Sequence, residues 1–363
     1  MPRSAALPAM QHDLALSYAQ IGLLLGVPTL VSAVVEPVVG LAGDTRWRRA
    51  LITGGGAAFA ASMLIIARAP AFCAVLAGMA LNYPASGAFV SLSQAVLMDL
   101  HPSKRAQNMS RWVMFGSVGA VAGPLGVAAS ERLGYGWRPA FVVVGVAAGL
   151  LAVAARRVPS PASGAHPRDG ARHALRALRD PQVVRWLALL ECADLLVDVM
   201  RGFLAVYLVA EAGATPALAA GCLAVLGAVD VAAGGLLVRL VERVEPLRIV
   251  RAGAVAALVF YPAALLAPWL PARLACFGVV AAATTGWYPL LKAQLYDALP
   301  ERSGSALALG SISSTAAGLV PPLLGLLAAR YGVGAAMWVL LTGPVVVLAG
   351  ARSGRRQSAA GSA

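Results

Sequence analysis

The chain has 363 residues, of which 59% are hydrophobic and only 12% are charged, and its mean hydropathy is +0.76. A soluble domain carries about twice that charged fraction, so this composition excludes an ordinary soluble enzyme or binding domain. The net charge of +13 is spread as arginines between apolar runs, so no nucleic-acid partner is expected. The composition predicts an all-α polytopic membrane protein that has the lipid bilayer as a partner.

The apolar residues occur in runs of about 20, the length that crosses a hydrocarbon core about 30 Å thick. Inside lipid each backbone N–H group must find an acceptor within its own segment, so these runs are expected to be helices. The sequence predicts eleven spans, near residues 17–42, 50–69, 71–99, 110–130, 138–156, 186–210, 217–241, 249–268, 272–297, 304–329 and 333–350.

One long polar stretch, rich in Pro, Gly, Ser and Arg, interrupts the series of spans. Such a composition is typical of a linker, here with a short amphipathic helix around Ala171–Asp180. The expected organisation is therefore an N-terminal half of five spans (1–158), a basic linker (159–185), a C-terminal half of six spans (186–350) and a tail (351–363).

The basic residues are distributed unequally between the two sides that these spans define. Of the 29 lysines and arginines, 21 fall on one side and six on the other, while Arg201 and Lys292 lie inside spans. The positive-inside rule places the rich side in the cytoplasm. We therefore expect a protein of the cell membrane whose linker and C-terminus are cytoplasmic and whose N-terminus is external.

A motif follows the first span, in the segment Gly40-Leu-Ala-Gly-Asp-Thr-Arg-Trp-Arg-Arg49. It resembles the loop signature G-x-x-x-D-[RK]-x-G-R-[RK] of the major facilitator superfamily. The segment matches this signature at Gly40, Asp44, Arg48 and Arg49. It departs from the signature at Thr45 and Trp47. The resemblance implies a two-half helical bundle that transports solutes, with this loop as a gating element. Glycine permits close helix approach, and Asp44 is expected to meet a helix N-terminus or a nearby arginine.

A second segment, Gly119–Pro124, resembles the G-x-x-x-G-P end of the superfamily's antiporter motif. The alternative is a close-packed helix with a proline kink. Tyr83–Ala88 together with Gly116–Pro124 loosely resembles the fosmidomycin-resistance, or drug-efflux, branch. Both motifs align the first span with the family's second helix. We therefore expect that a first family helix is missing because the start was assigned too late.

The sixth span contains the densest set of ionisable groups. Glu191, Asp194, Asp198 and Arg201 are separated by 3, 4 and 3 residues, which places them on one stripe of a regular helix. Charges inside a bilayer are costly, so these are candidates for proton coupling, with Arg201 beside Asp198 as a substrate-cavity candidate. The alternative is an ion-pair cluster that holds helices together.

Two further acidic residues lie inside spans and are also candidates for proton coupling. Glu36 precedes Pro37, which frees a backbone carbonyl and favours a polar pocket, and Asp230 occupies the seventh span. A hydrogen bond to a neighbouring helix is the competing interpretation.

Polar residues at helical spacing supply the remaining substrate-cavity candidates. Tyr288 and Lys292 are four residues apart, and this buried cation would suit an anionic or zwitterionic substrate or would neutralise the acidic stripe. Asn82 and Ser86 share another face, for which interhelical hydrogen bonds are an equal alternative.

No enzyme, metal or cofactor pattern emerges, because the four histidines are not at metal-ligand spacing and no GxxxxGK[ST] phosphate loop occurs. We expect a monomeric secondary transporter whose partners are protons and a small-molecule substrate, with proton-coupled efflux as the activity. The alternatives are a gradient-independent uniporter and a non-transporting sensor or inactive remnant.

Overall fold

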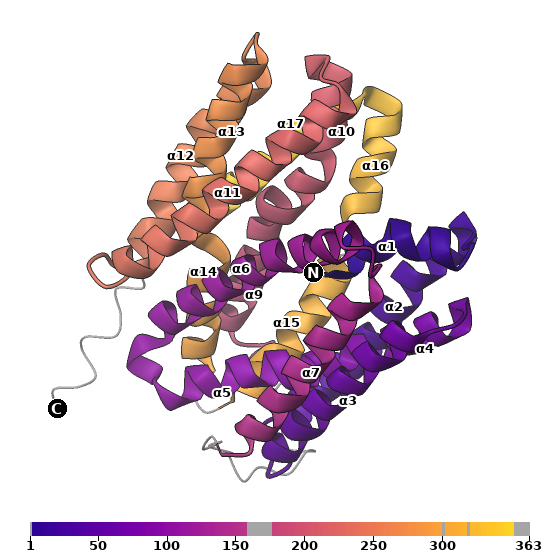
Figure 1. Cartoon of the computed structure of the whole chain (residues 1–363). Helices are drawn as coiled ribbons and strands as arrows, with labels where there is room; N and C mark the ends of the chain where they lie inside the picture. The colour runs from indigo at the N-terminus through magenta and orange to yellow at the C-terminus, as the bar shows by residue number, and fades with distance from the viewer. Residues whose placement is uncertain (1, 158–175, 300–301, 318–319, 352–363) are drawn as a thin grey trace, which may run out of the picture. The chain divides into compact units, whose positions relative to one another are not determined.

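The computed structural model describes residues 2–157, 176–299, 302–317 and 320–351. Helices occupy almost all of these residues, and the described ranges contain no strand (Figure 1). This confirms the predicted all-α fold. The expected amphipathic helix around Ala171–Asp180 falls largely outside the described residues, as does nearly all of the tail.

The described residues form two compact units, and each is described here by itself. Unit 1 contains residues 1–105, 115–180 and 296–315, and unit 2 contains residues 106–114, 181–295 and 316–363. These units differ from the expected halves in two short segments, 106–114 and 296–315, which join the other group.

Unit 1 contains the first seven α-helices, except residues 106–114 of α6, which belong to unit 2, and it contains the first part of a later helix. Their bounds are α1 (Pro2–Asp13), α2 (Tyr18–Ala42), α3 (Arg48–Arg68), α4 (Phe72–Ser86), the π-helix η1 (Gly87–Ser91), α5 (Leu92–Leu100), the short 3₁₀ helix η2 (Pro102–Lys104), α6 (Arg105–Arg132), α7 (Arg138–Ala155) and α15 (Ser303–Ala317).

Unit 2 contains the remaining helices, apart from the last residues of α14. Their bounds are α9 (Pro181–Asp194), the π-helix η3 (Leu195–Val199), α10 (Met200–Ala212), α11 (Pro216–Leu240), α12 (Pro246–Leu266), α13 (Leu270–Thr284), α14 (Trp287–Ala298), α16 (Val320–Tyr331), α17 (Val333–Val339) and α18 (Thr342–Gly350).

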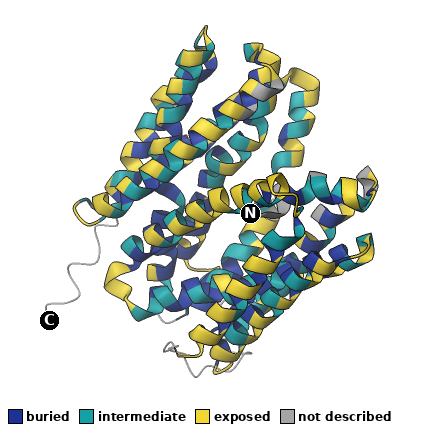
Figure 2. Cartoon of the chain, viewed as in Figure 1, coloured by how far each residue is buried: buried dark blue, intermediate teal, exposed yellow. Residues whose placement is uncertain are grey.

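Each expected span corresponds to a helix or to consecutive helices. Among the described residues, nine helical segments are long and apolar enough to cross a membrane. Gly26–Ala42 of α2 is a shorter apolar stretch. The span expected at 186–210 is α9, η3 and α10 in succession, and its charged residues reduce its apolar character. Large apolar side chains such as Leu30, Val34 and Leu150 are exposed on the helix surfaces (Figure 2), as expected where lipid is the solvent.

Helix α1 was not predicted. It has 12 residues, so it is about 18 Å long and too short to cross the hydrocarbon core. Ala6 and Met10 are fully buried in a core cluster that includes Trp137 and Phe141. The Asp13 carboxylate accepts hydrogen bonds from Trp137 Nε1 at 2.9 Å and from Arg138 at 3.0 Å. The low hydrophobicity of this segment concealed a helix that is stabilised by tertiary contacts.

Small residues set the packing of α3 in unit 1. A Cβ atom added to Gly55 would lie 2.6 Å from the Ala88 Cβ atom, whereas one added to Gly54 would meet nothing within 4 Å. One glycine of this run is therefore required for close approach to η1, and its neighbour is not.

The Gly55→Leu substitution is expected to lower the melting temperature of the purified protein, because overpacking a helix contact costs about 1–3 kcal/mol. The matched Gly54→Leu variant is expected to melt at or above the wild-type temperature, since leucine favours helix and the site is open. Equal destabilisation of the two variants in a thermal-shift measurement would contradict this packing.

Candidate functional site

The loop after α2 is joined to the N-terminus of α15 within unit 1. Asp44 Oδ1 accepts a hydrogen bond from the Gly304 N–H group at 2.7 Å, and Oδ2 accepts from the Ser305 N–H group at 2.7 Å and the Ser305 hydroxyl at 2.6 Å. The first turn of a helix has unpaired N–H groups and a positive dipole end, so a carboxylate fits there. This is the helix-terminus contact that the sequence motif predicts for Asp44.

Burial raises the pKa of the Asp44 carboxyl above its ordinary value. The hydrogen bonds from Ser305 and Gly304 and the charge of Arg48 act in the opposite direction. The loop therefore buries the Asp44 carboxyl group. Three hydrogen-bond donors and the nearby Arg48 offset the free-energy cost of removing it from water.

Arg48 connects the same loop to α5. Its Nη1 atom lies 2.7 Å from Asp99 Oδ2, and its Nη2 atom donates to the Ser303 hydroxyl, which in turn donates to Asp99 at 2.6 Å. The side chains of Arg48 and Asp99 are only 2% and 9% exposed. We call Asp44, Arg48, Asp99, Ser303 and Ser305 the loop network.

Glycines allow this contact to form. A Cβ atom on Gly40 would lie 2.8 Å from the Ala308 nitrogen, and one on Gly304 would overlap the Gly40 carbonyl oxygen. The backbones of α2 and α15 therefore touch. Arg49 is exposed and outside the loop network, so the four matched motif positions divide into three structural residues and one surface residue.

Sequence reasoning did not identify Asp99, Ser303 or Ser305 as part of this arrangement. Asp99 is the only acidic residue in the third span, and that position was the available signal. The serines carried no signal, because serine is common in helices that pack closely in membranes.

Glu36 also bridges α2 and α15. It accepts hydrogen bonds from the Ser32 hydroxyl on its own helix and from the Ser311 hydroxyl at 3.0 Å. Asn82 donates to the Ser62 hydroxyl at 2.8 Å and is fully buried, while Ser86 is half-buried on the same helix. Glu36 and Asn82 therefore form hydrogen bonds between helices, which is the alternative to a role in proton coupling or in the substrate cavity.

The acidic residues of the sixth span do not share one regular stripe. After Asp194 the chain forms the π-helix η3, which has more residues per turn than an α-helix and rotates everything that follows. As a result Arg201 does not pair with Asp198, contrary to the prediction. It forms a 2.8 Å ion pair with Asp230 of α11 instead.

A buried lysine of α14 faces the acidic residues of α9 and η3. The charges of Asp194 and Glu191 act on the Lys292 ammonium group, and those of Asp194, Asp198 and Glu191 act on the Tyr288 hydroxyl. Lys292 is 7% exposed, and no described residue forms an ion pair or hydrogen bond with it. We call Glu191, Asp194, Asp198, Tyr288 and Lys292 the acidic cluster.

The ion pair Arg201–Asp230 lies next to the acidic cluster. The Asp230 carboxylate also interacts with the Thr285 hydroxyl and is within electrostatic reach of Asp198. All these residues belong to unit 2, so this unit by itself brings together seven of the ten proton-coupling and substrate-cavity candidates. Glu36, Asn82 and Ser86 lie in unit 1.

The second motif lies on α6, which contains Pro124 within the helix. An apolar groove of about 810 Å³ separates this stretch from α7, and Gly116, Gly119, Gly123 and Gly126 line it. A Cβ atom on Gly116, Gly119 or Gly126 would meet no described atom within 4 Å. These three glycines therefore do not serve close helix packing among the described residues, although Val127 of the same helix is buried in a core cluster.

Comparisons with known proteins agree on the family. The sequence model of the Major Facilitator Superfamily matches residues 4–322. The inner membrane transport protein YajR of Escherichia coli is 36% identical over 123 residues, which span 32% of this chain and 26% of that relative.

Solved structures share the fold at low sequence identity. The E. coli fucose:proton symporter FucP has a TM-score of 0.81 at 18% identity, covering 97% of this chain and 93% of that one. The proton:xylose symporter XylE has a TM-score of 0.71 at 13% identity over 96% and 90% of the two chains. The human organic anion transporter MFSD10 has 0.68 at 19% identity over 97% and 89%.

The loop network predicts different consequences at two adjacent arginines. Arg48→Gln leaves the buried Asp99 without its cation, which is expected to cost about 3–5 kcal/mol and to reduce the yield and melting temperature of the folded protein. Arg49→Gln removes the same charge from an exposed position and is expected to change neither. Similar losses in both variants would mean that the network does not stabilise the loop.

The ion pair in unit 2 predicts non-additivity. Asp230→Asn or Arg201→Gln alone leaves one charge without its partner in a membrane-spanning unit, and each is expected to lower the amount of monodisperse protein in size-exclusion chromatography. The double variant is expected to recover part of that loss. Losses that simply add in the double variant would contradict a direct pair.

Proposed function

The chain belongs to the Major Facilitator Superfamily, and from this premise we propose that it exports a small molecule in exchange for protons by alternating access. Secondary transport itself follows from the family, whose members among the structural neighbours are transporters and not enzymes. The proposal concerns the driving ion, the direction and the residues.

The observation that carries the proposal is the charge imbalance of the acidic cluster. With the pair Arg201–Asp230 set aside as neutral, Asp194 and Asp198 remain near one buried lysine, Lys292. If both aspartates were ionised, the single positive charge of Lys292 would balance only one of them, and the repulsion between the two carboxylates would favour protonation of the other. Protons are the simplest compensating charges, so Asp194 and Asp198 are our proposed proton-binding groups.

The cluster also supports a mechanism of exchange. Lys292 acts most strongly on Asp194, while Asp198 is exposed. A substrate that enters beside Tyr288 and Lys292 would change the electrostatic environment of both aspartates and thereby their proton occupancy. Coupling then requires only that proton and substrate binding influence each other through the same charges.

Proton coupling is further supported by the fold relatives, because two of them are described as proton symporters. Those descriptions do not favour export. The proposed direction rests on the segment Gly119–Pro124 and its resemblance to the antiporter motif.

The loop network would act as the gate of this cycle. Asp44 and Arg48 hold the α2–α3 loop to the start of α15 in the described conformation, so breaking these contacts would accompany a change of state. We further propose a monomer in the cell membrane, with the basic linker and the C-terminus in the cytoplasm. The gradient-independent uniporter and the non-transporting sensor remain the alternatives.

The double variant Asp194→Asn/Asp198→Asn is expected to abolish proton-coupled flux while leaving insertion intact. Everted membrane vesicles with an imposed pH gradient and a fluorescent pH dye would be challenged with a panel of cationic, anionic and neutral compounds. A transported compound should dissipate the gradient in wild-type vesicles and should not do so in the double variant.

Glu131→Gln is the matched control, since it removes an exposed carboxylate at the end of α6 and should leave the flux unchanged. Unchanged coupled flux in the double variant would refute the assignment of the aspartates. Compound movement that ignores the gradient would indicate the uniporter, and absence of any movement across the panel would favour the sensor.

A further inference from the structure

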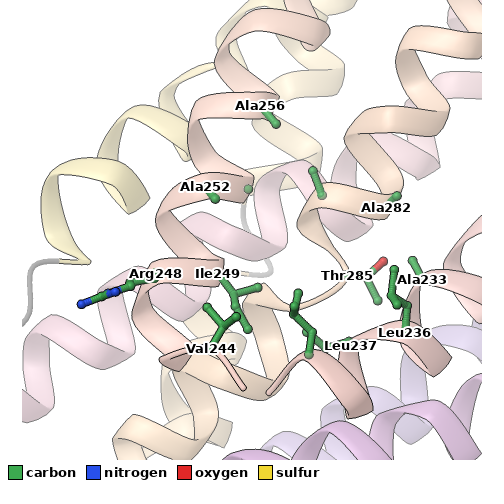
Figure 3. A pocket seen from close by; sticks show the side chains of 14 residues that line it. Ala233, Leu236, Leu237, Val244, Arg248, Ile249, Ala252, Ala256, Ala282 and Thr285 are labelled. Atoms are coloured by element: carbon green, nitrogen blue, oxygen red, sulfur yellow. The ribbon is translucent and has the colours of Figure 1, made fainter. Parts of the chain in front are cut away.

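An apolar groove lies between α11, α12 and α13 within unit 2 (Figure 3). Its volume is about 480 Å³, and only two of its 14 lining residues, Thr285 and Arg248, are polar. Half of the lining consists of small residues, namely Ala233, Ala252, Gly253, Ala256, Ala282, Ala283 and Gly286. Gly253 allows close contact between α12 and α13 at Ala283, and the short side chains of the other small residues leave the adjacent space of the groove unfilled.

The shape of the groove suits a chain better than a compact solute. It follows α12 from Arg248 to Ala256, which is about 12 Å at 1.5 Å per residue. One leaflet of a bilayer has a hydrocarbon depth of about 15 Å, half of the full core. The groove is therefore almost as long as the apolar part of a single leaflet.

Basic residues surround one end of the groove. In Figure 3 the Arg248 side chain points away from the apolar lining, at the end where Val244 and Ile249 lie. Arg239, Arg243 and Arg251 are exposed on the same end of α11 and α12, and all of them fall on the arginine-rich side of the chain. Two carboxylates are also present: Glu245, which contacts Arg248 at 3.0 Å, and Glu242, which contacts Gln107 and Arg111.

The side of the groove where α13 ends approaches the ion pair of unit 2, and this side includes Gly286, which lies beside Ile249 near the arginine end. Thr285 lines the groove, and its hydroxyl interacts with the Asp230 carboxylate of the ion pair. The Trp287 indole is fully buried against Gly253, a lining residue, and its Nε1 atom has no partner among the described residues. Thr285 alone would therefore separate an occupant of the groove from the Asp230 carboxylate.

We propose that this groove binds one anionic phospholipid, with an acyl chain along α12 and the headgroup phosphate on Arg248. An apolar channel of leaflet length that ends in arginines on the positively charged side matches the two parts of such a lipid. A zwitterionic lipid would fill the same channel but would gain less from the arginines. The Arg248–Glu245 pair is mostly exposed, so the phosphate can compete with that carboxylate.

Native mass spectrometry of the delipidated full chain would test the proposal, using phosphatidylglycerol and phosphatidylcholine with identical acyl chains. One phosphatidylglycerol per chain should bind about fivefold more tightly than phosphatidylcholine, the effect of about one arginine near a phosphate. Arg248→Gln should remove that preference, and Glu245→Gln should increase it. Ala252→Leu should weaken the binding of both lipids, because it fills the channel.

Two control variants share the chemistry but lie outside the groove lining. Arg330→Gln removes an exposed arginine of α16 that is not among the lining residues, and Ala232→Leu enlarges an exposed alanine of α11, so both should bind phosphatidylglycerol as the wild type does. Ala252 is itself exposed, so its enlargement should not disturb the fold. Equal affinity of the wild type for the two lipids, or equal losses in Ala252→Leu and Ala232→Leu, would overturn the proposal and indicate only a non-specific lipid shell.

Discussion

The free energy of placing a charge in hydrocarbon governs the arrangement of this protein. A charge without a partner in the bilayer costs at least a few kcal/mol, so ionisable side chains in the helices must be paired, hydrogen-bonded, wet or neutral. Arg48 meets this requirement through Asp99, and Arg201 through Asp230. The acidic cluster meets it only partly, because Asp194 and Asp198 both lie near the single ammonium group of Lys292. Groups that remain uncompensated by the protein are the ones available for exchange with the aqueous phases.

The same constraint explains why two regions of the chain differ in character. In the loop network the side chains of Asp44, Arg48 and Asp99 each bind a partner within the network, and glycines bring α2 and α15 close enough for the contacts of Asp44 to form. Such an arrangement is suited to holding one conformation. In the acidic cluster Lys292 is buried without an ion-pair or hydrogen-bond partner among the residues that the structure describes, and Asp198 is exposed. Such an arrangement is suited to a change of occupancy.

The sequence was sufficient for the parts of the fold that depend on composition. Runs of about 20 apolar residues define the membrane helices because a helix satisfies the backbone within a single segment in lipid, and the loop motif placed Asp44 correctly at a helix terminus. Helix α1 was missed, because its stability comes from contacts with distant residues such as Trp137. The pairing of Arg201 was predicted wrongly, because helical periodicity assumes an unbroken α-helix and η3 changes the register. Asp99 was missed because a single acidic residue at a helix end does not reveal its distant partner.

Carbodiimide labelling followed by peptide mass spectrometry would test the central claim most directly, since the reagent modifies protonated carboxyl groups in apolar surroundings and requires no knowledge of the substrate. If the acidic cluster binds exchangeable protons, the peptide that contains Asp194 and Asp198 should be labelled, and the labelling should decrease as the pH rises. Absence of label on that peptide at every pH, in protein that remains folded, would contradict the account.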